Sequence, residues 1–148
     1  MVLDDTIELK FKSSQQNTDM YLFSGTGTVN TGLRIQFKAD NTMTWGSGVG
    51  DVFIDATQIS SNSTSMIPYL DGVEHTISTR ATSLRDVNIF GHRDGGTFFI
   101  GVIKDILFTF NAGGTQSYAI DSGSNATEDS IEGGLPITFV NVDSGDWS

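Results

Sequence analysis

The chain contains 148 residues, carries a formal charge of −10 at neutral pH and has no cysteine. Its length suits one domain, and the lack of cysteine excludes disulfides and thiolate metal sites, so the fold depends on its apolar core. Eight basic residues among eighteen acidic ones offer no cationic patch for phosphates, which argues against nucleic acid and anionic membranes as partners. The sequence also lacks an apolar stretch near the ~20 residues that span a bilayer, so we expect no membrane insertion, and the first residues lack a signal-peptide pattern.

Short extended segments joined by tight turns account for the first third of the chain. Seventeen glycines against two prolines, with Ser, Thr, Asn and Asp between apolar runs, are typical of many turns. Apolar and polar residues alternate over 7–12 and again over 33–38, with a short strand over 20–23 between them. Asp40 and Asn41 then predict a hairpin into residues 43–45.

The rest of the chain continues this pattern less regularly. Polar loops are expected over 60–65 and 121–134. Strands are expected over 51–59, 66–70, 73–80, 87–90, 98–110, 117–120 and 135–139. In the longest of these, one face is predicted to be core, formed by Phe98, Ile100, Val102, Ile106, Phe108 and Phe110, with Lys104 as the only interruption.

Ten or more short strands at regular spacing favour an all-β, antiparallel two-sheet β-sandwich of jelly-roll type. An up-and-down barrel is the main alternative. No repeat and no linker divides the sequence, so residues 1–148 are predicted to form a single domain.

Several motifs follow one another in a recognisable order. They are IELKFKS at 7–13, YLFS at 21–24, GLRIQF at 32–37, DGVEHTI at 71–77, IFG at 89–91 and FFIGVIKDI at 98–106. In this order they resemble the concanavalin A-like, laminin G-like family of jelly rolls. The resemblance implies that fold, and it implies a structural role for His75 on a strand.

The end of the chain carries a second resemblance. YAIDSGS at 118–124, two glycines at 133–134 and Asp146-Trp147 are similar to the endings of lectin-like domains in bacteriophage tail proteins. This implies a virion or extracellular adhesion module that recognises a host-surface polysaccharide or oligosaccharide, as a homo-oligomer or in a larger tail assembly. Packing of Trp147 against the sandwich is the structural alternative.

The carboxylates give no catalytic pattern, and we predict that the protein is not an enzyme. Glucan hydrolases among the related jelly rolls place alternating carboxylates on one strand, and this chain has no such Glu-x-Asp-x-x-Glu motif. The nearest pair, Asp51 and Asp55, would lie about 13 Å apart by strand rise, beyond the separations that glycosidases use. A hydrolase with an unrecognised site stays a minor alternative.

Sugar recognition needs an aromatic face and planar polar groups. Trp45, flanked by Gly46 and Gly48, is the best platform, although a lone Trp in a sandwich also serves as core packing. Arg34 points away from the predicted core face, and Tyr69 lies beside a polar loop. The candidate carbohydrate-binding residues are Trp45, Arg34, Tyr69, His92, Arg93 and Asp94; the last three form a polar loop tip that could equally be a solvated turn.

Calcium is the one cofactor that the sequence suggests. Asp121, Asn125, Glu128 and Asp129 supply hard oxygen ligands within one segment, but their spacing fits no EF-hand loop, so an unliganded acidic loop is the alternative. The sequence as a whole favours a non-catalytic carbohydrate-binding module. The main alternative is an assembly domain that contacts a neighbouring chain, commonly in a symmetric oligomer.

Overall fold

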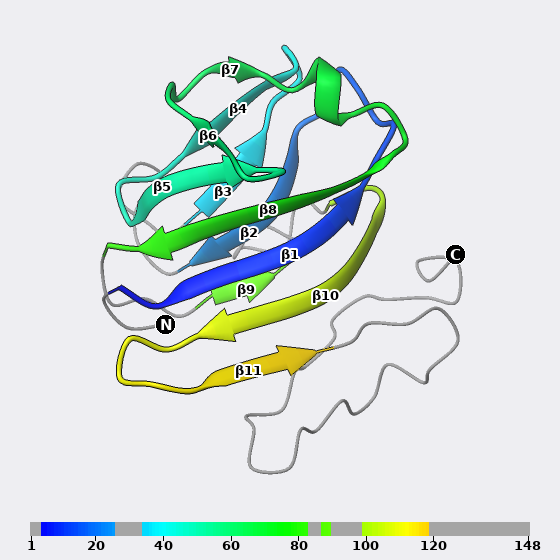
Figure 1. The fold of residues 1–148 in the computed structure, drawn as a ribbon. Coiled ribbons are helices and arrows are strands. Elements are labelled where there is room, and N and C mark those ends of the chain that lie inside the picture. The colour runs from blue at the N-terminus through cyan, green and yellow to red at the C-terminus, as the bar shows by residue number, and fades with distance from the viewer. Residues whose placement is uncertain (1–3, 26–33, 83–86, 90–98, 119–148) are drawn as a thin grey trace.

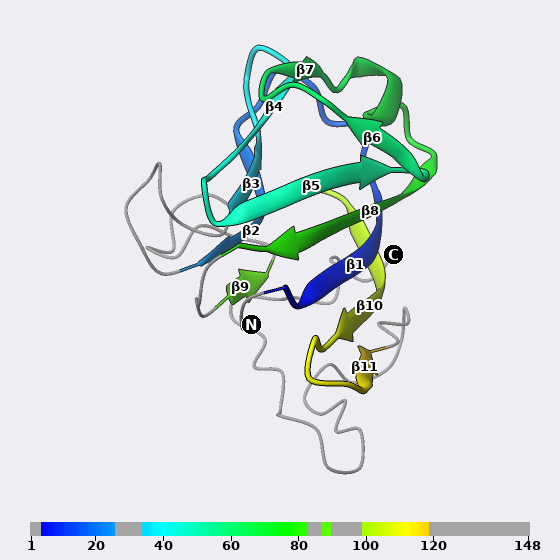
Figure 2. The same cartoon turned by 60° about the vertical axis from the view of Figure 1, so that its left-hand side comes forward.

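The computed structural model describes residues 4–25, 34–82, 87–89 and 99–118. These residues form two antiparallel sheets packed face to face, which confirms the predicted all-β sandwich (Figure 1). Figure 2 shows the two sheets as separate layers, and no strand pairing joins them among the described residues, which favours a sandwich over the barrel alternative. The described residues include no helix long and apolar enough to cross a membrane.

The two sheets end in short edge strands, which limits pairing with other chains. The six-stranded sheet has the order β11-β10-β1-β8-β5-β6, with bounds β1 Thr6–Lys12, β5 Val49–Ile54, β6 Thr57–Ile59, β8 Glu74–Ala81, β10 Val102–Thr109 and β11 Thr115–Tyr118. The five-stranded sheet has the order β7-β4-β3-β2-β9, with bounds β2 Met20–Gly25, β3 Arg34–Phe37, β4 Thr42–Trp45, β7 Thr64–Ser65 and β9 Val87–Ile89.

Alternating residues build the core between the sheets. On β1, Ile7, Leu9 and Phe11 are each about 1 % exposed, while the residues between them face solvent or are half-buried. Phe37 on β3 meets Phe11 across the sandwich with ring centroids 5.5 Å apart. The core is therefore shared by the two sheets and holds their outer faces in fixed positions.

The predicted β3–β4 hairpin is confirmed. Asn41 takes a positive φ of 60°, which asparagine tolerates, and the Asp40 carboxylate accepts hydrogen bonds from the backbone N–H and the hydroxyl of Thr42. These bonds turn the chain, and they set Phe37 opposite Met43 in the register.

Three predictions for the middle of the chain need correction, the first of them only in part. Residues 51–59 form a hairpin of β5 and β6, because Asp55 and Ala56 both take positive φ, the requirement of a tight type I′ turn. The expected strand at 66–70 is instead the 3-10 turn η1 (Ile67–Tyr69), with Pro68 near its start, and the expected loop before it contains β7.

The regular alternation expected along 98–110 was also wrong in its first half. Asp105 takes a φ of 48° and the pairing with β1 shifts there, so a β-bulge reverses which residues face inward. Ile103 therefore pairs with Phe11 on the core side, and Ile100 is 49 % exposed. Beyond the bulge, Ile106 is fully buried, as expected.

Several expected features lie outside the described residues. They are Phe98, the loop at 121–134, the strand at 135–139 and Trp147. The expected strand at 117–120 is observed as far as Tyr118, in β11.

Candidate binding site on the outer face of the five-stranded sheet

The outer face of the five-stranded sheet is polar because its strands alternate. In β3, Ile35 and Phe37 are fully buried, which turns Arg34 and Gln36 to the opposite face. The register sets Tyr21 of β2 and Thr44 of β4 beside Gln36 in one row across three strands. The paired strands thus place an amide, a hydroxyl and a guanidinium on one face, beside the largely buried ring of Tyr21.

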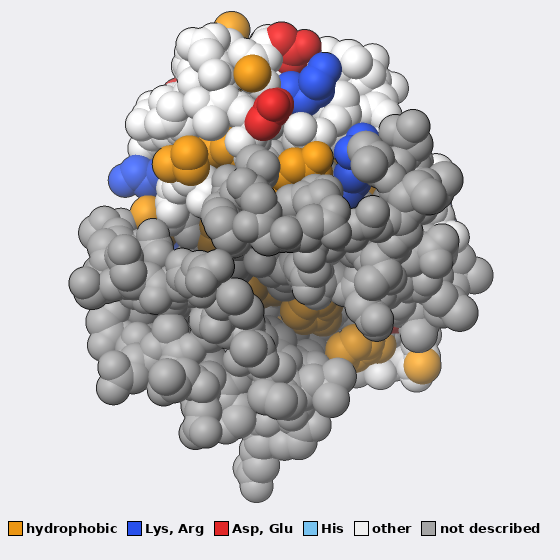
Figure 3. Space-filling model, turned by 180° about the vertical axis from the view of Figure 1, so that it is seen from behind, with side chains coloured by type: hydrophobic (Ala, Val, Ile, Leu, Met, Phe, Trp, Pro, Cys, Tyr) orange, Lys and Arg blue, Asp and Glu red, His pale blue; other side chains and the backbone are white. Residues whose placement is uncertain are grey.

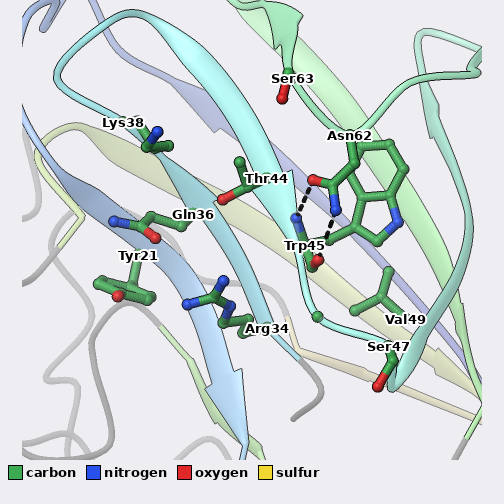
Figure 4. Close-up of a pocket in the computed structure, with 11 residues that line it drawn as sticks. Tyr21, Arg34, Gln36, Lys38, Thr44, Trp45, Ser47, Val49, Asn62 and Ser63 are labelled. Atoms are coloured by element: carbon green, nitrogen blue, oxygen red, sulfur yellow. Dashed lines mark hydrogen bonds between the residues drawn. The ribbon is translucent and has the colours of Figure 1, made fainter. Parts of the chain in front are cut away.

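An open depression of about 660 Å³ lies on this surface (Figure 4). Its lining residues are Tyr21, Arg34, Gln36, Lys38, Thr44, Trp45, Gly46, Ser47, Val49, Asn62 and Ser63. Figure 4 shows Tyr21, Arg34 and Gln36 close together on one side of it. Figure 3 views the molecule from this side, and basic side chains appear at several places on the described surface.

Arg34 is the least satisfied charged group of the depression. Its Nε atom is buried and has no hydrogen-bond partner among the described residues, and no described carboxylate lies within ion-pair distance of its guanidinium. A buried donor without a partner costs roughly 1–3 kcal/mol, and more when it is charged. Lys38, the second cation, approaches Asp40 at 3.4 Å, with both side chains well exposed.

Trp45 borders the depression from the core side of the sheet. It pairs with Ile35, which faces inward, and its half-buried indole packs against the core cluster. Figure 4 shows the ring on the Val49 side of β4, away from Arg34. The structure thus brings Arg34 and Trp45 to the same depression but on different faces of the sheet.

Asn62 is a site residue that the sequence analysis missed. Its side-chain amide accepts a hydrogen bond from the Trp45 N–H at 2.8 Å and donates one to the Trp45 carbonyl at 3.0 Å. The amide thereby acts as a strand partner for the end of β4, beyond the short β7. The one sequence signal for Asn62 was its position in a polar loop that follows the predicted hairpin.

Tyr69 lies elsewhere. It belongs to η1 and packs edge-on against His75, with ring centroids 5.4 Å apart, and it does not line the depression. The structure therefore does not bring Tyr69 together with Arg34 or Trp45.

His75 joins two turns at one end of the six-stranded sheet. Its Nδ1 lies 2.7 Å from Asp55 Oδ2 and its Nε2 lies 3.1 Å from Asp71 Oδ1, while Phe11 packs against the ring. Burial opposes the charged ring, but the hydrogen bonds with the two carboxylates outweigh it and raise the pKa of His75. This environment agrees with the structural role expected for His75.

The other candidates for chemistry are placed as follows. Asp55 lies in the β5–β6 turn rather than on a strand with Asp51, so the strand spacing assumed for that pair does not apply. Within the described residues, no three His, Asp or Glu side chains are arranged to hold a metal ion. Outside the described residues lie His92, Arg93 and Asp94, and the possible calcium ligands Asp121, Asn125, Glu128 and Asp129.

Comparison of the chain with protein-family models, with curated proteins and with solved structures gives no match.

Proposed function

We propose that this protein is a non-catalytic carbohydrate-binding module whose site is the depression on the outer face of the five-stranded sheet. The observation that carries the proposal is the row Tyr21, Gln36 and Thr44 beside Arg34, fixed on three paired strands. Planar amide and guanidinium groups, together with hydroxyls, match the hydroxyls of a sugar, and an open site suits a wet, modest-affinity contact. Placement on strands holds these groups more firmly than loops would.

The proposal extends to the finer fold and the setting of the domain. We propose a concanavalin A-like jelly roll that serves host adhesion in a phage tail or another surface protein. The order of the matched motifs supports this, since the segments at 7–13, 21–24 and 32–37 overlap β1, β2 and β3. Those at 71–77 and 98–106 overlap β8 and β10 in the same way.

A glycan array tests the proposal with the full chain, in calcium and again with chelator. We expect binding that Gln36→Ala weakens, because its amide lies in the middle of the row. Ser78→Ala is the matched control, because Ser78 pairs with exposed Glu8 in the six-stranded sheet. Binding unaffected by Gln36→Ala, or no binding to any glycan, would contradict the proposal. Sensitivity to chelator would assign a role to calcium.

An assembly function is the second candidate, and exposed apolar side chains favour it. Val73 is 57 % exposed and Ile100 is 49 % exposed. Ser13 holds their chain segments together, because its carbonyl accepts from the Gly72 N–H and its hydroxyl donates to the Ile100 carbonyl. Exposed apolar side chains that form a contiguous patch are typical of contact surfaces, and we propose that these two neighbouring segments form one.

Sedimentation velocity over a range of protein concentrations tests this second candidate. We expect self-association that the double substitution Val73→Ser and Ile100→Ser removes. A monomer at every concentration would exclude a homo-oligomer through this surface.

A further inference from the structure

We infer that the ligand of this depression is a carboxylate-bearing oligosaccharide, of the uronic-acid or sialic-acid type, anchored by Arg34. The inference rests on the proposed function and adds the chemical class of the ligand. Its basis is a contrast in charge. The chain carries −10, yet among the described residues those that line the depression include Arg34 and Lys38 and no Asp or Glu.

The Arg34 guanidinium is chemically suited to a carboxylate. A guanidinium forms a planar fork that binds a carboxylate through two parallel hydrogen bonds, whereas sugar hydroxyls gain less from a full charge. The Nε of Arg34 is buried without a partner among the described residues, so one donor of that fork is already desolvated and unused. Because the Nε is covered, a ligand carboxylate would bind the two terminal nitrogens of the guanidinium, which have no described carboxylate partner.

The neighbours of Arg34 fit the remaining groups of a sugar. Gln36 follows on the same face of β3, and Tyr21 pairs with it from β2. The Gln36 amide offers hydrogen bonds beside the anchor, and Tyr21, which is 9 % exposed, forms part of the wall there. Figure 4 shows these three side chains converging on the same part of the depression.

The spacing of the two cations favours an oligosaccharide over a monosaccharide. Lys38 lies four residues beyond Arg34 along the same strand direction, which corresponds to about 13 Å at the rise of a strand. Figure 4 shows the side chain of Gln36 between those of the two cations, so we expect a carboxylate bound at Arg34 to leave Lys38 for another sugar unit. Arg34 is the primary anchor, because Lys38 already shares its charge with Asp40.

The negative charge of the whole chain argues against a densely charged phosphate polymer as the ligand. Repulsion from the surrounding acidic side chains acts over about 8 Å at physiological ionic strength. Closely spaced phosphates on either side of Arg34 would therefore be repelled. Carboxylates spaced along a sugar chain place fewer charges against the acidic surface. A sparse carboxylated glycan is therefore the better match.

Calorimetry with matched probes tests the inference. The acidic probes are oligomers of polygalacturonate, alginate and sialyl-oligosaccharides, and the neutral probe is fully methyl-esterified polygalacturonate, which keeps the sugar and removes the charge. We expect an acidic probe to bind and its neutral counterpart to bind roughly tenfold more weakly or worse, the usual loss for a hydrogen bond to a charged group. Affinity should also fall as salt rises.

Variants locate the effect. Arg34→Gln should weaken binding of the acidic probe roughly tenfold or more, and Arg34→Lys should restore only part of it, because lysine keeps the charge without the fork. Lys104→Gln is the control, since it removes the same charge from the six-stranded sheet and should leave affinity unchanged. Unchanged circular dichroism and urea midpoint establish that each variant is folded.

The outcomes separate the inference from the proposed function. Equal binding of neutral and acidic probes, with loss in Gln36→Ala, would overturn the carboxylate and leave the carbohydrate-binding function standing. Absence of binding to every acidic and neutral glycan would overturn both. Tighter binding of a single-stranded oligonucleotide than of any glycan would overturn the inference in favour of a phosphate ligand.

Discussion

The outer faces of the two sheets differ in how their basic side chains are paired with carboxylates. On the six-stranded sheet, Lys10 meets Asp105 at 2.6 Å, Lys104 meets Glu74 at 3.5 Å, and Arg80 lies 2.9 Å from Asp4. These cations have partners on neighbouring strands or at a strand end, and all of these side chains are well exposed. Most described cations of that face are therefore neutralised in place, and the exposed Lys12 at the end of β1 is the exception.

The five-stranded sheet leaves its central cation without such a partner. Arg34 has no described carboxylate within ion-pair distance, although the chain contains eighteen acidic residues. A self-neutralised face gains little from an ionic ligand, because a new carboxylate would compete with existing ones. The contrast teaches that the total charge of a chain does not determine how charges are paired on each face of the fold.

Truncation of the shared core should have the largest effect. Phe37→Ala removes a fully buried ring that contacts Phe11 of the other sheet and the ring of Phe99. We expect a loss of about 3–5 kcal/mol in the free energy of unfolding, from lost burial and the cavity left behind. Urea unfolding followed by circular dichroism measures it. Separate transitions for the two sheets would contradict a shared core.

Giving Arg34 an internal partner should make the two faces alike. Gln36→Glu places a carboxylate two residues from Arg34 on the same face, and it replaces the 3.5 Å hydrogen bond from the Gln36 amide to Asp19 with a contact between like charges. We expect binding of an acidic oligosaccharide to weaken roughly tenfold or more, with a slightly lower urea midpoint because of the repulsion from Asp19. Calorimetry measures the affinity. Thr76→Glu, opposite Lys10 in the other sheet, is the control with the same charge change; a similar loss there would point to general repulsion instead.

Much of the fold was predictable because, in most strands, every second residue is apolar and faces the core. The strands β1 and β3 and the Asp40-Asn41 turn needed no tertiary information. The bulge at Asp105 could not be predicted, since it arises from pairing with β1 and reverses the faces of β10. The Asp55-Ala56 turn was missed because alanine gives no signal for positive φ.

The site was predictable in part for the same reason. Arg34 alternates with Ile35 and Phe37, so its outward direction follows from the sequence alone, and Gln36 follows by the same rule. Trp45 lies two residues after buried Met43 on β4 and is therefore expected on the same, core-facing side. The glycines next to Trp45 favoured the other interpretation, an exposed platform. Recognition of Tyr21 and Asn62 required strand register and loop position, which no local pattern encodes.

In two described residues a side-chain polar atom is buried without a hydrogen-bond partner. We expect substitution of one to change stability and substitution of the other to change ligand binding. Thr79 Oγ1 faces the core, between Ile7 of β1 and Val52 of β5, whereas Arg34 Nε belongs to the depression. We expect Thr79→Val to raise the free energy of unfolding by about 1 kcal/mol, because a methyl group replaces an unsatisfied hydroxyl of similar shape. Ligand affinity should not change. A lower urea midpoint would show that the hydroxyl is satisfied in solution.

The smallest expected effect is a pH dependence of stability that arises at one end of the six-stranded sheet. Both ring nitrogens of His75 face carboxylates, so only the protonated ring can donate to Asp55 and Asp71 at once. Hydrogen bonds and charge attraction outweigh burial and raise the pKa of His75. The pKa of Asp55 is lowered, since burial is outweighed by hydrogen bonds from His75 and the Thr76 N–H.

The signs of these shifts define where the cluster stabilises the fold. The histidine contributes fully below its unfolded pKa of about 6.5 and loses that contribution as pH rises through its higher folded pKa. Asp55 contributes above about pH 4 and loses its contribution as pH falls through its lower folded pKa. We therefore expect the urea midpoint to be lower at pH 8.5 than at pH 5.5, by an amount that His75→Gln removes. A pH dependence that persists in the variant would place its origin outside this cluster.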